Sequence, residues 1–343
     1  MTVNSLLNSY RSALPSSSGS SWPADGRDID TATATSLTVN GTSVTLDRFD
    51  GYTLDTEGAY PIVVSNPIRL RLELWGGGGG GSSGGAAGSA GGWIAGDMVL
   101  SAGTYWLLVA GGGVYSTGLP AFPDSSTTSE SSGGGSSRFG PASTYLTANQ
   151  VHTKGNGFNN SNAVYWLIAG GGGGGSNHAT TEDTPGRGGE GNGGGFCGTT
   201  GHLYYGAGES GDSCGTGGGQ SYGGLTGTAG RLNAHADGDG LKYYSGRGSG
   251  AGGGGGYYGG AGARGYYATG GGGSSYYDPD YVRNVSCRFG GRSGGVENGY
   301  RQAIRGFRGK PHVDTGDGGT NTAQDAHGHD GGARLSLWVP NGN

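Results

Sequence analysis

Runs of up to six consecutive glycines follow strand-like sequences at several places in the chain. The sequence IRLRLELW at 68–75 alternates apolar and charged residues, as a half-buried strand does, and six glycines come directly after it. TYWLLVA at 104–110 precedes three glycines, and VYWLIA at 164–169 precedes six. A fourth strand-like sequence, ARLSLWV, lies at 333–339. These are internal repeats of one unit, an aromatic and aliphatic strand associated with polyglycine.

Glycine is so abundant that it limits the kind of core the chain can form. The 343 residues include 86 glycines, and hydrophobic residues make up 32%, against about 45–50% in an ordinary globular protein. Glycine-rich chains are often disordered, but this one has 6 Trp, 20 Tyr and only 13% charged residues, which argues against a flexible linker. The composition therefore predicts an ordered protein without a conventional hydrophobic core.

Polyglycine can form an ordered structure through its backbone alone. Glycine adopts the extended helix of three residues per turn without steric cost, and the absence of a Cβ lets neighbours approach from every side. Such helices can exchange N–H···O=C hydrogen bonds with several neighbours at once. We therefore expect a mostly β and irregular fold, in which packed polyglycine II helices are anchored at one end by a small antiparallel sheet.

The first 54 residues differ from the rest and are predicted to form an attachment segment. Apolar residues at helical spacing from Leu6 to Leu14 predict a short helix, and a Ser/Pro/Gly linker follows at 15–27. Asn40-Gly41 lies between two alternating runs and predicts a β-hairpin with a tight turn. The glycine-rich body is assigned to residues 55–343.

Charge, hydropathy and cysteine content exclude several classes of protein. A formal net charge of −5 argues against a nucleic-acid binder. No run of 18 apolar residues is present, so membrane insertion is not expected, and the first residues lack the pattern of a secretory signal. Cys197, Cys214 and Cys287 show no CxxC spacing. Free thiols are expected, with a bridge between Cys197 and Cys214 left open.

No catalytic motif exceeds what the glycine content produces by itself. GDSCG at 211–215 fits the nucleophile pattern G-x-S-x-G, but windows centred on four other serines fit it too. His327 and His329 form an H-x-H pair, which in a trimeric fibre would supply six imidazole ligands for a metal; two solvated loop histidines are the preferred interpretation. We expect no enzymatic activity and no cofactor.

The glycine runs and their aromatic flanks resemble a known family. LELWGGGGGG at 72–81, GGWIAGDMVLSAGTYWLLVAGGG at 91–113, VYWLIAGGGGGGS at 164–176 and GGGGGYYGGAG with GGGGSSYY at 252–277 carry the resemblance. It is to the glycine-rich domain of bacteriophage tail-fibre tip adhesins and appendage proteins, where polyglycine helices form a sandwich. The glycine-rich domain of anaplastic lymphoma kinase receptors is more distantly similar. The resemblance covers about residues 60–340, and the receptors' dense cysteines are missing here.

The resemblance implies a non-enzymatic virion protein, assembled in the host cytoplasm, that acts as a tail-fibre or tail-tip adhesin. Residues 1–54 would bind other virion proteins, and a homo-oligomer, for example a trimer, is expected. Loops between the glycine helices would contact a host surface glycan or outer-membrane protein, although their rings could equally lie flat and shield the backbone. A capsid decoration protein or an extracellular filament subunit is the alternative. The candidate receptor-binding residues are Tyr204, Tyr205, Tyr243, Tyr244, Tyr257, Tyr258, Tyr266, Tyr267, Tyr276 and Tyr277.

Overall fold

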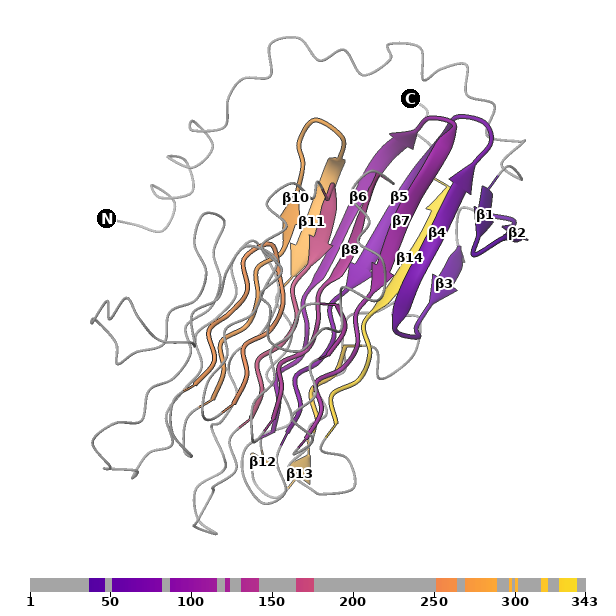
Figure 1. The fold of residues 1–343 in the computed structure, drawn as a ribbon. Coiled ribbons are helices and arrows are strands. Elements are labelled where there is room, and N and C mark those ends of the chain that lie inside the picture. Colours follow the sequence, from indigo (N-terminus) through magenta and orange to yellow (C-terminus); the bar gives the residue numbers. More distant parts are fainter. Residues whose placement is uncertain are drawn as a thin grey trace, which may run out of the picture.

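The computed structural model of the chain contains two main antiparallel sheets and a separate two-stranded one (Figure 1). No helix occurs among the described residues, so none there is suited to crossing a bilayer. The helix expected between Leu6 and Leu14 lies outside them. The structure describes residues 37–46, 51–81, 87–115, 121–123, 131–141, 165–175, 251–263, 269–288, 296–297, 300–301, 316–319 and 327–337.

The larger sheet has seven strands in the order β10-β9-β8-β7-β4-β1-β2, all paired antiparallel. Its longest pairing joins β4 to β7, from Gly58 opposite Val109 to Val64 opposite Gly103. The strands are β1 (Leu37–Val39), β2 (Thr42–Val44), β4 (Gly58–Val64), β7 (Gly103–Val109), β8 (Ser137–Pro141), β9 (Leu167–Ala169) and β10 (Tyr276–Tyr277).

The smaller sheet has five strands in the order β11-β6-β5-β14-β3. Its central pair, β5 and β6, runs in register from Ile68 opposite Leu100 to Trp75 opposite Trp93. A separate short hairpin is formed by β12 (Val296–Glu297) and β13 (Tyr300–Arg301). The strands of the five-stranded sheet are β3 (Tyr52–Leu54), β5 (Ile68–Trp75), β6 (Trp93–Leu100), β11 (Arg283–Arg288) and β14 (Gly332–Leu337).

The predicted hairpin around Asn40-Gly41 is present as β1 and β2. Asn40 and Gly41 both have positive φ, 49° and 78°, which is the conformation of a type I′ turn. β1 also pairs with β4, so the hairpin extends the seven-stranded sheet. β3, which reaches Leu54, pairs with β14 in the other sheet. The described strands before residue 55 therefore pair with strands of the glycine-rich body, and the attachment role expected for residues 1–54 stays a prediction.

A hydrophobic core lies between the two sheets, contrary to the expectation from composition. Leu70, Leu72 and Leu74 alternate along β5 with charged residues and are fully buried. They belong to one cluster with residues of the seven-stranded sheet, including Ile62 and Leu107. The low overall share of apolar residues misled the prediction, because the apolar residues are concentrated in the strands. The two sheets form a β-sandwich with an ordinary side-chain core.

In place of the one small antiparallel sheet that the sequence predicts, the structure has two main sheets, and the strand repeats are divided between them. β5 and β14 lie in the five-stranded sheet, whereas β7 and β9 lie in the seven-stranded sheet. β5 and β14 pair with each other, and all four strands contribute residues to the same core.

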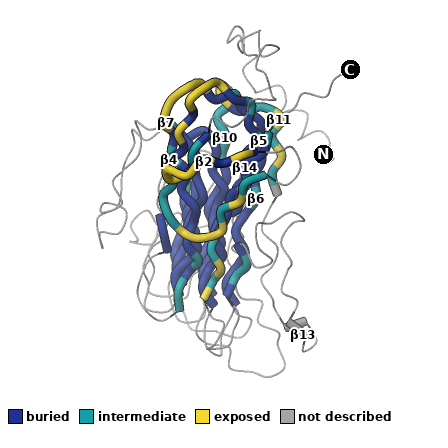
Figure 2. The backbone as a smooth tube through the Cα atoms, turned by 90° about the vertical axis from the view of Figure 1, so that its right-hand side faces the viewer, coloured by how far each residue is buried: buried dark blue, intermediate teal, exposed yellow. Residues whose placement is uncertain are grey.

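Beyond one end of the sandwich, extended glycine-rich segments continue the lines of the strands (Figure 1). Gly76 follows β5 directly, Gly92 precedes β6, and Gly170 follows β9. Backbone hydrogen bonds connect these segments, and most of their residues are buried (Figure 2). We call this region the glycine lattice; it comprises residues 76–80, 88–92, 110–114, 131–135, 170–175, 251–263, 270–274, 316–319 and 328–331.

The hydrogen bonds of the lattice repeat every three residues. Along 76–80, three successive amides donate hydrogen bonds to three different neighbouring segments, and amides three residues apart donate to the same segment. In a β-strand, by contrast, successive backbone groups alternate between two sides. The acceptor carbonyls belong to Gly92, Gly135, His329, Ser89 and Ser132 for residues 76, 77, 78, 79 and 80, at N···O distances between 2.8 and 3.0 Å.

The carbonyl groups of the same segment bind still other neighbours. Gly77 accepts a hydrogen bond from Gly172, and Gly80 accepts one from Gly175, again three residues apart on both segments. The carbonyls of Gly78 and Gly79 accept from the amides of residues 113 and 319. The segment 76–80 is thus surrounded by hydrogen-bonded backbone on all sides.

Glycine is required here because backbone fills the place that a Cβ would take. A Cβ on Gly78 would lie 1.9 Å from the carbonyl oxygen of Asp317, and one on Gly79 would lie 2.0 Å from that of Gly173. Gly134 and Gly172 have similar surroundings, at 2.1 and 2.0 Å. No side chain can be placed at these positions unless a hydrogen-bonded neighbour moves.

Candidate binding surfaces

Two of the candidate tyrosines form a stacked pair on the outer face of the seven-stranded sheet. The rings of Tyr257 and Tyr276 lie 3.9 Å apart with an interplanar angle of 8°. Both pack against a small cluster that includes Leu108 and Ile168. Burial, followed by the nearby Asp278 carboxylate, raises the pKa of the Tyr276 hydroxyl far above its ordinary value. This pair attaches a lattice segment to the sheet.

Tyr258 and Tyr277 also contribute to packing. The ring of Tyr258 meets that of Tyr257 edge-on at 5.3 Å, and its backbone amide donates to the hydroxyl of Ser274. Tyr277 lies in β10 opposite Leu167 and packs against the main core. All four described rings are half-buried, so they shield and join parts of the body. The other six candidates, Tyr204, Tyr205, Tyr243, Tyr244, Tyr266 and Tyr267, lie outside the described residues.

His327 and His329 lie at the start of the segment that leads into β14. Nδ1 of His327 accepts a hydrogen bond from the amide of Tyr115 at 3.4 Å, and His329 binds the lattice through its backbone. Both side chains are exposed. Across the part of the chain that the structure describes, no group of three or more potential metal ligands occurs.

The carboxylate of Asp330 connects the lattice to the turn before β4. Its Oδ1 accepts from the amide of Gly112 at 2.9 Å, and its Oδ2 accepts from the amide of Glu57 at 3.1 Å. The carboxylate that follows His329 in the sequence therefore binds two backbone amides. Its role in the described region is structural.

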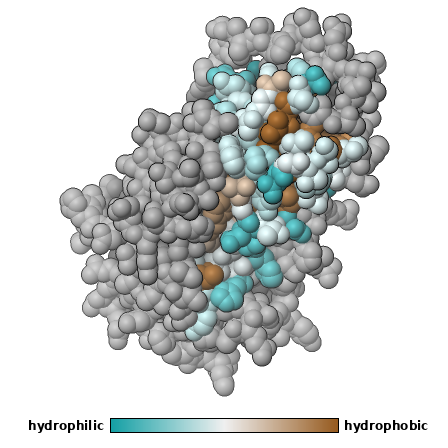
Figure 3. All heavy atoms as spheres, turned by 45° about the vertical axis from the view of Figure 1, so that its right-hand side comes forward, coloured by the Kyte–Doolittle hydropathy of each residue, from teal (hydrophilic) through white to brown (hydrophobic). Residues whose placement is uncertain are grey.

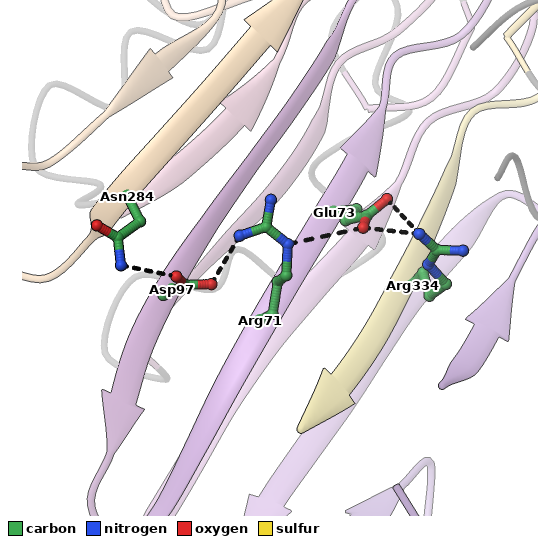
Figure 4. A network of polar contacts seen from close by, with 5 residues as sticks. All are labelled: Arg71, Glu73, Asp97, Asn284 and Arg334. Carbon is green, nitrogen blue, oxygen red and sulfur yellow. Dashed lines mark hydrogen bonds and ion pairs between the residues drawn. The ribbon is translucent and has the colours of Figure 1, made fainter. Parts of the chain in front are cut away.

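A chain of polar contacts crosses the outer face of the five-stranded sheet (Figure 4). Arg71 of β5 donates to the Asp97 carboxylate of β6 at 2.8 Å, directly across the strand pair. Arg334 of β14 donates to both oxygens of Glu73, at 2.7 and 2.8 Å. Arg71 also lies 3.8 Å from Glu73, which joins the two pairs. The two acids are buried and each is matched by an arginine, so the network is balanced in charge.

Asn284 ends this network through a local irregularity in β11. The register of β11 against β6 shifts between Arg283 and Ser286, and Asn284 has a positive φ of 49°. This bulge directs the side-chain amide of Asn284 to the second oxygen of Asp97, at 3.0 Å. The alternation in IRLRLELW indicated an outward charged face, but nothing in the sequence indicated the bulge.

The turn between β10 and β11 contains an aromatic residue, Tyr281, that is not among the predicted tyrosine pairs. Tyr281 stacks on Trp166 with ring centroids 4.3 Å apart and an interplanar angle of 10°. It is nevertheless 47% exposed, whereas Trp166 is buried. The same turn contains two acids, and burial raises the pKa of one of them, Asp278. A single tyrosine that follows two aspartates carries no distinctive sequence signal.

Few large hydrophobic side chains are exposed on the described surface. Figure 3 shows one face, where a hydrophobic area in the upper part is bordered by hydrophilic residues. Among the described residues, Val63 and Tyr281 are the exposed large hydrophobic side chains. Tyr281 is the one that combines exposure with a rigid aromatic support.

Cys287 carries a free thiol in β11. Burial raises the pKa of this thiol, which makes it a poor nucleophile near neutral pH. Cys197 and Cys214 lie outside the described residues, so the pairing that we left open stays open.

Comparison with known proteins adds no assignment, because no family model and no curated protein matches the sequence.

Proposed function

We propose that the glycine lattice is a bundle of polyglycine II helices. Two observations support this: amides three residues apart bind the same neighbour, and a single segment exchanges hydrogen bonds with neighbours on all sides. A helix with three residues per turn presents its backbone groups in three directions, which is the repeat that the hydrogen bonds follow. The lattice and the sandwich together would form one rigid rod.

We further propose that the chain is a non-enzymatic virion protein, a phage tail-fibre or tail-tip adhesin that binds the host surface. The observation that carries this proposal is the three-residue hydrogen-bond repeat, because packed glycine helices are the feature of the phage adhesins that the sequence resembles. A rigid lattice would hold the loops at its far end in fixed positions. Rigid presentation lowers the entropy lost on binding a receptor.

The positions of the tyrosines and of the first strands narrow down which parts of the chain are proposed to contact the receptor and other virion proteins. The described rings of Tyr257, Tyr258, Tyr276 and Tyr277 are used in packing, so receptor contact is proposed for the remaining six candidates. Attachment to other virion proteins is proposed for residues 1–36, because the strands between 37 and 54 are part of the sandwich.

A competition experiment tests the adhesin proposal. Purified chain should bind susceptible cells and reduce infection in a dose-dependent way, and replacing Tyr243 and Tyr244 together by alanine should weaken both effects. Replacing Val63, an exposed residue of the sandwich, by alanine is the matched control and should change neither. A chain that folds but neither binds cells nor competes would contradict the proposal and favour a decoration or filament subunit.

A further inference from the structure

The turn that joins β10 to β11 is held rigidly at the end of the sandwich opposite the lattice (Figure 1). The amide of Asp278 donates to the carbonyl of Trp166 at 2.8 Å, and the amide of Val282 donates back to the carbonyl of Asp278 at 2.9 Å. Oδ1 of Asp278 accepts from the amide of Asp280 at 3.0 Å. These bonds fix the backbone around Tyr281, so its ring is presented without a large loss of freedom on binding.

The ring of Tyr281 has a fixed support on one side. It stacks on Trp166, whose own ring packs against Tyr105 and Phe139 inside the sandwich. Almost half of the Tyr281 side chain nevertheless remains exposed. The face of an aromatic ring carries partial negative charge, which attracts cations.

Two carboxylates of the same turn, those of Asp278 and Asp280, have no cationic partner among the described residues. Within the described part of the chain, no lysine, arginine or histidine forms an ion pair with Asp278 or Asp280. Burial raises the pKa of Asp278, the Asp280 carboxylate raises it further, and only the hydrogen bond from the Asp280 amide opposes them. The next basic residue, Arg283, begins β11 and lies opposite Asp97 in the sheet. The turn thus combines two carboxylates that have no cationic partner in the described region with an exposed aromatic ring.

We propose that the surface formed by Asp278, Asp280 and Tyr281 binds an arginine side chain of a partner protein. A guanidinium group stacks on an aromatic face and donates several hydrogen bonds to carboxylates, so its chemistry matches both the exposed ring and the two acids of the turn. A lysine ammonium satisfies the charge but stacks less well. The inference is independent of the adhesin proposal, because it concerns the end of the sandwich away from the lattice loops.

Binding of short labelled peptides to the full chain tests the inference. Fluorescence anisotropy at low salt should detect a peptide containing two arginines and otherwise only glycine, with weaker binding of the matched lysine peptide. Tyr281→Ala and Asp280→Asn should each lower the affinity for the arginine peptide by about two- to five-fold, the size expected for an exposed cation–π contact or ion pair. Tyr281→Phe should retain binding, because it keeps the ring.

Asp55→Asn is the matched control, because it removes one exposed carboxylate elsewhere on the surface. It should leave the affinity nearly unchanged. Equal losses in Asp55→Asn and Asp280→Asn would overturn the inference, since they would indicate general attraction to a negative protein. Unchanged affinity in Tyr281→Ala, or no binding to the unaltered chain at millimolar peptide, would also overturn it. Near-UV circular dichroism confirms that each variant is folded.

Discussion

The sandwich and the glycine lattice are stabilised by opposite parts of the polypeptide. In the sandwich, side chains such as Leu72 and Leu107 meet in a core between two sheets. In the lattice, the interior consists of backbone, and carbonyl oxygens occupy the places where side chains would lie. The same chain therefore uses burial of apolar side chains in one region and hydrogen bonding of bare backbone in the other.

The comparison teaches why the lattice needs the sandwich. Ordering a residue costs about 1–2 kcal/mol of backbone entropy, and glycine is at the costly end. A backbone hydrogen bond returns only about 1 kcal/mol net. Several lattice segments directly follow or precede a strand, as at Trp75, Trp93 and Ala169, so the sandwich fixes one end of these segments. The stability of the lattice then depends on having its segments held side by side, and the sandwich holds one end of several of them in place.

Among the substitutions considered, the largest loss of stability is expected from adding a single methyl group inside the lattice. In Gly78→Ala the new Cβ would meet the carbonyl group of Asp317, with 1.9 Å to its oxygen and 2.4 Å to its carbon. Because this carbonyl group accepts a hydrogen bond from the amide of His329 and cannot move freely, we expect a loss of more than about 4 kcal/mol in the free energy of unfolding. Thermal or urea denaturation followed by circular dichroism measures it.

Gly41→Ala is the control for that substitution. Gly41 lies in the hairpin turn, where a Cβ would meet nothing within 4 Å, although its φ of 78° favours glycine. Its replacement should cost only about 1 kcal/mol. Similar losses at Gly41 and Gly78 would show that the lattice is not closely packed.

The next effect concerns the side-chain core. Leu72 is fully buried in the middle of β5, and Leu72→Ala should cost about 3 kcal/mol through lost burial and the cavity that remains. Val63→Ala, on an exposed site of β4, should change stability by less than about 0.5 kcal/mol. A loss at Leu72 no larger than that at Val63 would contradict the presence of a packed core.

A smaller effect is expected from the polar network on the outer face. Asp97→Ala removes the acceptor for both Arg71 and Asn284, and it should cost about 1–2 kcal/mol. The value is moderate because the Arg71 side chain is 31% exposed and water can replace part of the lost contact. Combining Asp97→Ala with Arg71→Ala gives a double-mutant cycle, and additive losses would mean that the pair does not interact.

The smallest change in stability is expected from replacing Asp278, and this change should depend on pH in a defined direction. The pKa of Asp278 is raised in the folded state, so the charged carboxylate destabilises the fold above that pKa. Asp278→Asn keeps the acceptor for the Asp280 amide and should stabilise the protein at neutral pH by no more than about 0.5 kcal/mol, since the site is partly solvated. The gain should vanish as the pH falls through the folded-state pKa. A gain that grows in acid would reverse the assigned sign.

Local patterns in the sequence predicted strands and turns better than their arrangement. Alternation identified β5 and the Asn40-Gly41 dipeptide identified the hairpin, because both signals act within a few residues. The distribution of strands over two sheets depends on long-range pairing, such as that of β14 with β5, which no local pattern encodes. Average composition concealed the core for a similar reason, since a mean cannot show that apolar residues are concentrated in strands.

The candidate site was predictable to a smaller extent. Tyrosine pairs were easy to find, but Tyr257 and Tyr276 stack on each other across separate segments, which turns them from expected contact residues into packing residues. Tyr281 was overlooked because its importance comes from Trp166, a residue more than a hundred positions away. A surface that is assembled from segments distant in the sequence can be recognised only once the fold is known.

Residue-resolved hydrogen exchange along 76–80 tests the central claim most directly. The hydrogen bonds require five consecutive amides, from Gly76 to Gly80, to be protected, because each donates to a neighbouring segment. The account therefore predicts slow exchange at every one of these positions, comparable with the central strand β5. Protection at alternate positions would indicate an edge β-strand, and fast exchange throughout would indicate no lattice; either result would contradict the account.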